Sequence, residues 1–268
     1  MKLEKFSPFV LLVLFVLTLS FYYKSAIQKI GLGQMKEENI FSAAKTGNLE
    51  TLNRLLEANI NPDTRDDKGG TALFYAVGNN QIDAAKLLIK KGASLKIKDD
   101  NGMTALHWAV RNGDESGILV KLLSSEGAYI EERDKNGNTP LLSTMETGGT
   151  VGNLTSLLPF KPDLNSQNNF GDNALARACA NGDIDSTILL LKNGANPNLQ
   201  RSDGITPLII AVSGGHLTIV KELLGKKADP KIKDKNKSNA FDALLLCRES
   251  ERVKIRDLLN KLHIGANQ

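Results

Sequence analysis

The chain has 268 residues, of which 41% are hydrophobic and 5% are aromatic. This length and apolar content allow a sizeable core built from Leu, Ile, Val and Ala. The formal net charge of +4 is spread along the chain, whereas nucleic-acid-binding proteins concentrate basic residues on one face. The charge pattern therefore argues against nucleic acid as a partner.

The N-terminus has the pattern of an export signal. Lys2 and Lys5 precede an apolar run from Phe9 to Leu19, and these are the charged and hydrophobic parts of such a signal. We assign residues 1–26 to a signal peptide or a signal anchor, and residues 27–35 to a linker. Export of the remaining chain is the expected consequence.

The fate of this segment has two interpretations. Thr18 and Ser20 are small residues that offer a weak cleavage site. The aromatic run Phe21–Tyr23 followed by Lys24 resembles the interfacial belt and basic stop of a membrane anchor. Residues 6–23 are at the short end of a spanning helix, so they would hold an uncleaved chain at the membrane.

After residue 35, one pattern returns with a period of about 33 residues. Each copy has a Gly-containing turn, a short helix with small apolar residues, and a second helix with a Leu pair such as Leu87-Leu88. Projecting one period back from the first turn predicts a further copy that lacks its turn. The predicted copies are 36–65, 66–98, 99–133, 134–167, 168–200, 201–233 and 234–263, followed by a tail at 264–268.

The residue before each first helix has a side chain that can cap it by accepting a backbone hydrogen bond. The residues at this position are Thr71, Thr104, Thr139, Asn173, Thr206 and Asn239. Apolar residues spaced three and four apart give each helix one buried face, and stacked copies share a continuous core because no copy can bury that face alone. The pattern predicts an all-α solenoid of seven helix-turn-helix units with β-turn or hairpin tips, preceded by an N-terminal hydrophobic helix.

This repeat resembles that of the ankyrin family, whose core motif is T-P-L-H-x-A. His107 occupies the histidine position of that motif, and Ser213–Leu224 is close to the family pattern through a whole helix-turn-helix. The resemblance implies a domain that binds other proteins through its tips and the concave surface of its first helices. It implies no cofactor.

The middle repeats depart from the family pattern. Repeat 3 holds extra residues around 114–117. Repeat 4 has Thr144-Met145 in place of an Ala pair and Pro159-Phe160 in place of Gly-Ala. We therefore expect the middle of the solenoid to be its least regular part.

The sequence contains no motif that predicts catalysis. The three histidines, His107, His216 and His263, do not have metal-ligand spacing. Cys179 and Cys247 fall two layers apart in the stack, too far for a disulfide, and are expected to be inert core thiols. Nucleophile elbows, phosphate loops and zinc motifs do not occur. We expect a protein that is not an enzyme and has no metal or cofactor.

Large apolar residues at the tips give the sharpest hypothesis about binding. Met103, Phe170 and Ile205 stand where polar residues would serve a turn equally well, and interface hot spots favour large side chains ringed by polar ones. Alternatively, each folds down onto its own helix. The full set of candidate protein-binding residues is Arg65, Lys68, Met103, Arg111, Asn112, Asn136, Asn138, Glu146, Phe170, Asp172, Asp203 and Ile205.

Export combined with a binding module predicts an envelope protein that captures one protein partner. Among ankyrin-repeat proteins of bacterial envelopes, the resemblance points to immunity proteins that neutralise a secreted antibacterial toxin, such as a phospholipase effector, by covering its active surface. The competing interpretations are a membrane-tethered scaffold, a protector of an envelope enzyme and, more distantly, an unrecognised enzyme. We expect a periplasmic or inner-membrane-anchored protein that is monomeric on its own.

Overall fold

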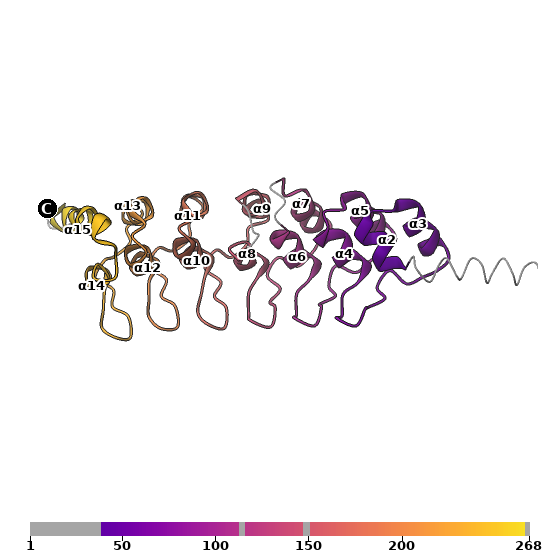
Figure 1. Cartoon of the computed structure of the whole chain (residues 1–268), viewed down its shortest axis with the longest axis horizontal. Helices are drawn as coiled ribbons and strands as arrows, with labels where there is room; N and C mark the ends of the chain where they lie inside the picture. Colours follow the sequence, from indigo (N-terminus) through magenta and orange to yellow (C-terminus); the bar gives the residue numbers. More distant parts are fainter. Residues whose placement is uncertain (1–38, 113–115, 147–150, 266–268) are drawn as a thin grey trace, which may run out of the picture.

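The computed structural model describes residues 39–112, 116–146 and 151–265, in which two rows of helices lie above a row of loops (Figure 1). The row next to the loops contains the first helix of each repeat: α2 (Ile40–Thr46), α4 (Ala72–Gly78), α6 (Ala105–Arg111), α8 (Pro140–Ser143), α10 (Ala174–Asn181), α12 (Pro207–Ser213) and α14 (Ala240–Ala243). The outer row contains the second helices: α3 (Leu49–Glu57), α5 (Ile82–Lys90), α7 (Ile118–Ser125), α9 (Val151–Leu157), α11 (Ile184–Lys192), α13 (Leu217–Gly225) and α15 (Glu249–Gly265). A short 3₁₀ helix, η2 (Leu158–Phe160), extends α9.

This arrangement confirms the predicted solenoid. Each first helix contacts the first helices of the adjacent repeats, and each second helix contacts the adjacent second helices. The described tips are turns without an assigned strand. Every repeat thus uses its neighbours to cover its apolar face, as a linear stack requires.

One leucine of each second helix forms the spine of the core. These residues are Leu52, Leu88, Leu123, Leu157, Leu190, Leu223 and Leu259, and all are fully buried. Full burial of one leucine contributes about 1.5–3 kcal/mol. Six of these seven leucines, all but Leu52, belong to the Leu pairs seen in the sequence, which therefore contribute to the packing between repeats.

Most of the predicted helix caps are present. Thr139 accepts from the N–H of Leu142, Asn173 from Ala176 and Thr206 from Ile209. Thr71 holds the same position before α4 without such a bond. Capping by these residues fixes where each first helix begins, and hence which side chains its first turn presents.

Backbone hydrogen bonds join successive tips. The N–H of Asp100 donates to Lys68 O at 3.1 Å, and Lys135 donates to Asn101 O at 2.9 Å. Gly102 allows this approach because its φ is +77° and a Cβ there would lie 2.9 Å from the nitrogen of Lys135. The tips are therefore connected and present a continuous edge.

The sequence correctly predicts one of the two shortest first helices, but not the other. In repeat 4, α8 has 4 residues, as its unusual sequence suggests. However, α14 in the last repeat is equally short, which the sequence did not predict. After α14, Leu244 to Cys247 continue in 3₁₀ turns, because each N–H bonds three residues back.

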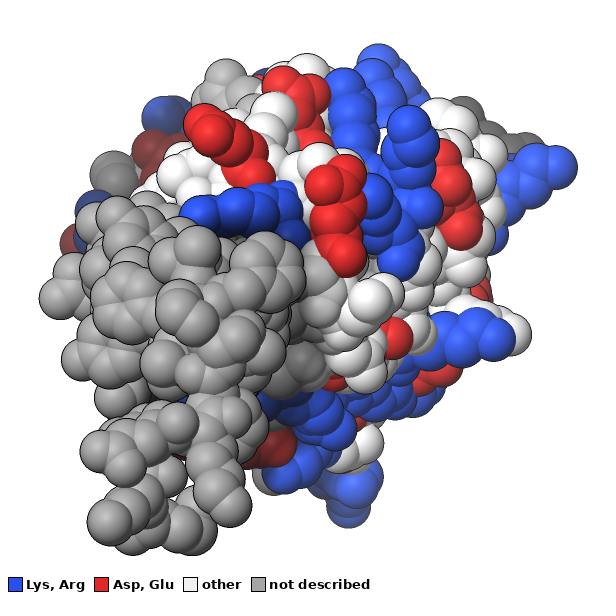
Figure 2. All heavy atoms as spheres, turned by 90° about the vertical axis from the view of Figure 1, so that its right-hand side faces the viewer, with Lys and Arg blue, Asp and Glu red and all other residues white. Residues whose placement is uncertain are grey.

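The predicted signal or anchor at 1–26 and the linker at 27–35 lie outside the described residues. Across the described ranges, no helix has both the length and the apolar character needed to cross a membrane. On the N-terminal end face shown in Figure 2, basic and acidic side chains lie next to one another, so that face carries mixed charge.

Candidate protein-binding groove

Three adjoining hollows lie between the tips and the first helices, with volumes of about 610, 660 and 820 Å³. We name them, in that order, the aromatic, middle and charged hollows. Trp108 lines the first two, and Arg111 lines the second and third. The three hollows therefore form one groove that runs along the tip side of the first helices from Lys45 to Arg201.

The aromatic hollow is built around Tyr75 of α4 and Trp108 of α6. The two residues are each the fourth of their helix, so they occupy equivalent positions in adjacent repeats. The Tyr75 hydroxyl donates a short hydrogen bond to Asp66 Oδ2, and Trp108 Nε1 donates to Asp99 Oδ2 at 3.1 Å. Each ring is held in place by the first aspartate of its own tip.

These bonds have electrostatic consequences. The hydrogen bond from Tyr75 is the main cause that lowers the pKa of Asp66, and the same bond raises the pKa of the Tyr75 hydroxyl. The pair is thus fixed as carboxylate acceptor and neutral phenol donor. Asp99 is buried and also accepts from the N–H groups of Asn101 and Met103, so three hydrogen bonds hold its carboxylate in place.

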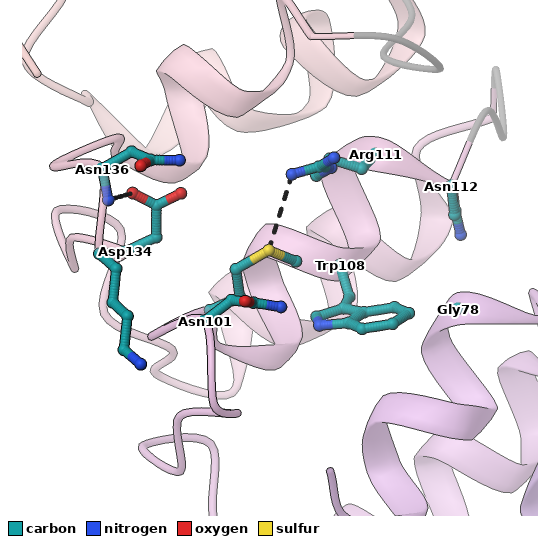
Figure 3. Close-up of a pocket in the computed structure, with 9 residues that line it drawn as sticks. Gly78, Asn101, Trp108, Arg111, Asn112, Asp134 and Asn136 are labelled. Carbon is teal, nitrogen blue, oxygen red and sulfur yellow. Dashed lines mark hydrogen bonds between the residues drawn. The ribbon is translucent and has the colours of Figure 1, made fainter. Parts of the chain in front are cut away.

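Aromatic neighbours support the two rings from below. Phe74 meets Trp108 edge-on with 6.2 Å between ring centroids, and Phe41 lies 5.6 Å from Tyr75. The Trp108 ring passes beside Gly78 (Figure 3), where a Cβ would lie only 2.9 Å from a ring carbon. A glycine in α4 therefore makes room for the indole of the next repeat.

The charged hollow contains a row of alternating arginines and acids. Arg111 Nη1 lies 2.6 Å from Glu146 Oε2, and Arg177 Nη1 lies 3.1 Å from Glu146 Oε1. Arg177 and Arg201 both contact Asp172, with nitrogen to oxygen distances of 3.5 and 3.1 Å. Arg201 also reaches Asp203 at 3.6 Å. We call these six residues, which span four repeats, the ion-pair row.

Buried amides hold the row in place and explain one wrong expectation. Asn138 was predicted to face outward, but it is only 1% exposed. Its Nδ2 donates to Asp134 Oδ2 at 3.1 Å and to Glu146 Oε1 at 3.2 Å, and its Oδ1 accepts from Asn168 Nδ2 at 2.9 Å. Asn138 therefore orients Glu146 from beneath the groove.

The three apolar tip residues have different surroundings. Phe170 is 60% exposed, as expected, whereas Met103 is only 8% exposed, and the expectation of an exposed Met103 is wrong. Its sulfur lies 3.6 Å from Arg111 Nη1. Ile205 is half-buried and packs against the core. For Met103 and Ile205 the folded-down alternative is thus the better description.

Two further candidates serve the stack itself. Arg65 donates to the carbonyls of Gly69 and Lys98, at 3.1 and 2.8 Å, and so braces two successive tips. The Asn112 amide donates to Val77 O in the preceding repeat at 3.1 Å, although Asn112 also lines the middle hollow. Arg65 and Asn112 therefore both stabilise contacts between adjacent repeats, a role that the sequence did not reveal.

The groove brings together much of the predicted set and adds residues that the sequence analysis missed. Lys68 lines the aromatic hollow, Asn136 lines the other two, and Arg111, Glu146, Asp172 and Asp203 belong to the ion-pair row. Arg177 and Arg201 are missed residues, and Tyr75 and Trp108, whose shared repeat position is typical of packing in the groove, are also absent from the candidate set. One signal could have found three of them, because Tyr75, Trp108 and Arg177 are each the fourth residue of a first helix.

Three titratable side chains, Cys179, Cys247 and His107, are buried in the stack. Cys179 and Cys247 are free, buried thiols, as predicted, and burial raises the pKa of Cys179 to about 12, which keeps it protonated. His107 is buried beside Thr104, and burial lowers its pKa. Within the described ranges, no group of three His, Cys, Asp or Glu residues is arranged to hold a metal.

Curated relatives match short parts of the chain. The ankyrin repeat protein L92 of Acanthamoeba polyphaga mimivirus is 37% identical over 82 residues, which are 30% of this chain and 20% of that protein. The ankyrin repeat protein FPV031 of fowlpox virus is 34% identical over 90 residues, 32% of this chain and 26% of that one. The matched stretches thus span about a quarter or less of these relatives.

Solved structures match over most of the fold. The ankyrin repeat domain of Bcl-3 has a TM-score of 0.71 and 26% identity, covering 81% of this chain and 97% of that one. The human ASB11 ankyrin repeat domain has a TM-score of 0.70, with the same coverage and 20% identity, and so shows the fold alone. A chain in the complex of the predatory endopeptidase Bd0816 from Bdellovibrio bacteriovorus with the immunity protein Bd3460 has a TM-score of 0.62 and 26% identity, covering 70% of this chain and 98% of that one.

The family model described as ankyrin repeats (3 copies) matches residues 40–134, 113–201 and 149–234. These overlapping matches run through most of the described stack and agree with its helix pairs. Domains of this kind are protein-binding modules. The chain belongs to the ankyrin-repeat family.

Proposed function

We propose that this protein binds one protein partner in its groove and has no catalytic activity of its own. The composition of the groove is the observation that carries the proposal. Tyr75, Trp108, Arg111, Arg177 and Arg201 line it, and Trp, Tyr and Arg are the residues in which interface hot spots are enriched. These five come from four repeats, as an extended protein-binding surface requires.

The groove side chains are also pre-organised. Trp108 is 37% exposed, yet its ring is fixed by Asp99 and by Phe74. Arg177 is fixed between Glu146 and Asp172. Because ordering a long side chain on binding costs about 0.5–1.5 kcal/mol, side chains that are already ordered favour tight association.

We further propose that the protein acts outside the cytoplasm and inhibits its partner by covering the partner's active surface. The export pattern of Lys2, Lys5 and Phe9–Leu19 supports the location. The likeness to a chain from a complex of a bacterial endopeptidase with an immunity protein supports inhibition. On this proposal the partner is a secreted enzyme, such as an antibacterial toxin, and the source is a bacterium.

Comparative affinity capture tests the binding proposal. The full chain, tagged at its C-terminus, is compared with the double variant Trp108→Ala, Arg177→Ala, after circular dichroism has shown that both are folded. The control is Lys121→Ala, Lys192→Ala, which changes two exposed residues on second helices away from the groove. Quantitative mass spectrometry then identifies proteins that the parent and the control retain.

A partner confirmed with purified proteins should bind the groove variant at least about a hundredfold more weakly, since two hot-spot truncations typically cost more than about 3 kcal/mol together. Its enzymatic activity should fall on titration with the parent chain. Equal binding by the groove variant and the parent would overturn the groove as the binding site. Binding without loss of the partner's activity would overturn inhibition and favour a scaffold.

A further inference from the structure

We infer that the aromatic hollow, which Tyr75 and Trp108 both line, receives an arginine side chain from the partner. This inference rests on the proposed function and specifies the chemistry that the partner must present. It starts from the charges around the hollow. Asp66, Asp99 and Asp100 line it with Lys45 and Lys68, so three carboxylates face two ammonium groups.

The position of the carboxylates favours a cation beside these rings. Asp66 and Asp99 each accept a hydrogen bond from the polar edge of a ring. This leaves a negative charge beside each ring and strengthens the attraction of the ring face for a cation. Asp100 is an exposed residue that lines the hollow, and its carboxylate lies 3.8 Å from Arg65 Nη2.

Within the described residues, neither Tyr75 nor Trp108 has a lysine or arginine over its ring. In the part of the chain that the structure describes, the lysine that lies over an aromatic ring is Lys96, whose Nζ is 5.4 Å from the centroid of Tyr129. Lys45 and Lys68 are exposed residues that line the hollow, and neither side chain lies over the ring of Tyr75 or Trp108. No described cation therefore occupies the place that we assign to the guanidinium.

Size and shape favour arginine over smaller cations. The hollow of about 610 Å³ is within the range of about 300–1,000 Å³ typical of ligand sites, so one long side chain and its flanking backbone can enter. A guanidinium is planar, stacks on aromatic faces and donates in a fork to a carboxylate, whereas an ammonium is a compact and strongly hydrated point charge. Stacking on Trp108 with donation to Asp100 uses all of these properties.

Trp108 makes the inference directly testable because the chain contains one tryptophan. Its fluorescence and its single indole N–H signal in ¹⁵N NMR spectra both report on the hollow. The probe is the peptide Ac-Gly-Arg-Gly-NH₂, titrated at constant ionic strength. The matched control is the same peptide with citrulline, which has nearly the same shape without the charge.

The arginine peptide should shift both signals saturably, with a dissociation constant in the millimolar range and about tenfold tighter binding than the citrulline peptide. Tyr75→Leu should weaken binding about tenfold, while Tyr75→Phe, which keeps the ring, should stay within about threefold of the parent. Tyr129→Leu changes an exposed tyrosine elsewhere and should have no effect. The NMR spectrum of each variant checks that it is folded.

Equal binding of the arginine and citrulline peptides would overturn the inference, as would the absence of any shift at Trp108. These outcomes are distinct from failure of the proposed function. If the arginine peptide fails while Trp108→Ala, Arg177→Ala still loses the protein partner, the groove binds a partner of other chemistry. If the arginine peptide binds but that double variant keeps its partner, the hollow binds a guanidinium, but the inference that the partner supplies it is overturned together with the groove as the protein-binding site.

Discussion

Arg177 Nη1 lies 3.1 Å from Glu146 Oε1, although the two residues are 31 positions apart and belong to different repeats. Glu146 also receives Arg111, at 2.6 Å, and the amide of buried Asn138. One carboxylate therefore ties together three repeats on the floor of the groove. The same contact links the stability of the stack to the shape of its candidate binding surface.

Removal of this carboxylate should destabilise the fold. Glu146→Ala leaves Arg111, Arg177 and Asn138 without a shared acceptor in a half-buried place, and we expect a loss of about 2 kcal/mol in the free energy of unfolding. Urea denaturation followed by circular dichroism measures it. Asp83→Ala is the control, because it breaks an exposed pair with Lys86 that should contribute less than about 0.5 kcal/mol. Similar losses in both variants would contradict a special role for Glu146.

Gly78→Ala should move the indole of Trp108 without unfolding the protein. The new Cβ would lie 2.9 Å from a ring carbon, so the ring must shift toward solvent, and its fluorescence emission should move to longer wavelength. Partner binding should weaken, while the higher helix propensity of Ala, worth about 1 kcal/mol, offsets part of the strain. Gly225→Ala, in α13 with no atom within 4 Å of its Cβ, should leave the emission unchanged.

Phe170→Ala tests whether the exposed tip adds to the groove. Because Phe170 is 60% exposed, its truncation should change the melting temperature little. If Phe170 is a hot spot, partner binding should weaken about thirtyfold, which corresponds to about 2 kcal/mol. Calorimetric titration with the identified partner measures this. Lys235→Ala, on the last tip, is the control, and an equally small effect of both variants would confine the interface to the groove.

Acid should weaken the stack through His107. Burial holds the pKa of this histidine below its value of 6.5 in the unfolded chain, so protons bind preferentially to the unfolded state. The stabilisation is complete above pH 6.5 and is lost as the pH falls below that value toward the folded-state pKa. Urea midpoints between pH 7.5 and 5.0 should therefore decline.

A glutamine in place of His107 isolates this effect. Gln at the third position of a helix can still bond the N-cap backbone, as His107 Nδ1 does by accepting from the N–H of Thr104 at 3.2 Å. His107→Gln should therefore fold, and its urea midpoint should depend less on pH in this window. A decline as steep as that of the parent would assign the effect to other groups.

Export can be tested with a reporter that is active only outside the cytoplasm, fused after Gln268 and expressed in a bacterium. The parent should give activity, because Lys2, Lys5 and the following apolar run have the pattern of an export signal. Changing Leu12 and Leu14 to Asp should abolish that activity, whereas changing the linker residue Gln34 to Asp should not. Activity of a cytoplasm-only reporter on the parent chain would contradict the proposal.

The sequence by itself determined the repeat, its caps and its leucine spine. These features are local, since a threonine before a helix or a leucine at helical spacing has the same role in every copy. The sequence could also have distinguished the exposed positions of a tip from the buried ones. The third residue of a tip, such as Phe170, precedes the glycine that reverses the chain and points outward, whereas the fifth, such as Met103 or Asn138, follows it and turns back toward the helices.

Only the tertiary structure decided which side chains meet between repeats. Glu146 meets Arg111 and Arg177, and Asp172 meets Arg201, because the packing of α6, α8 and α10 brings together residues about 30 positions apart. That packing depends on the summed fit of the leucine spine and the small residues of the first helices. No local pattern contains this information, so the ion-pair row and the groove beside it emerge only when the repeats are stacked.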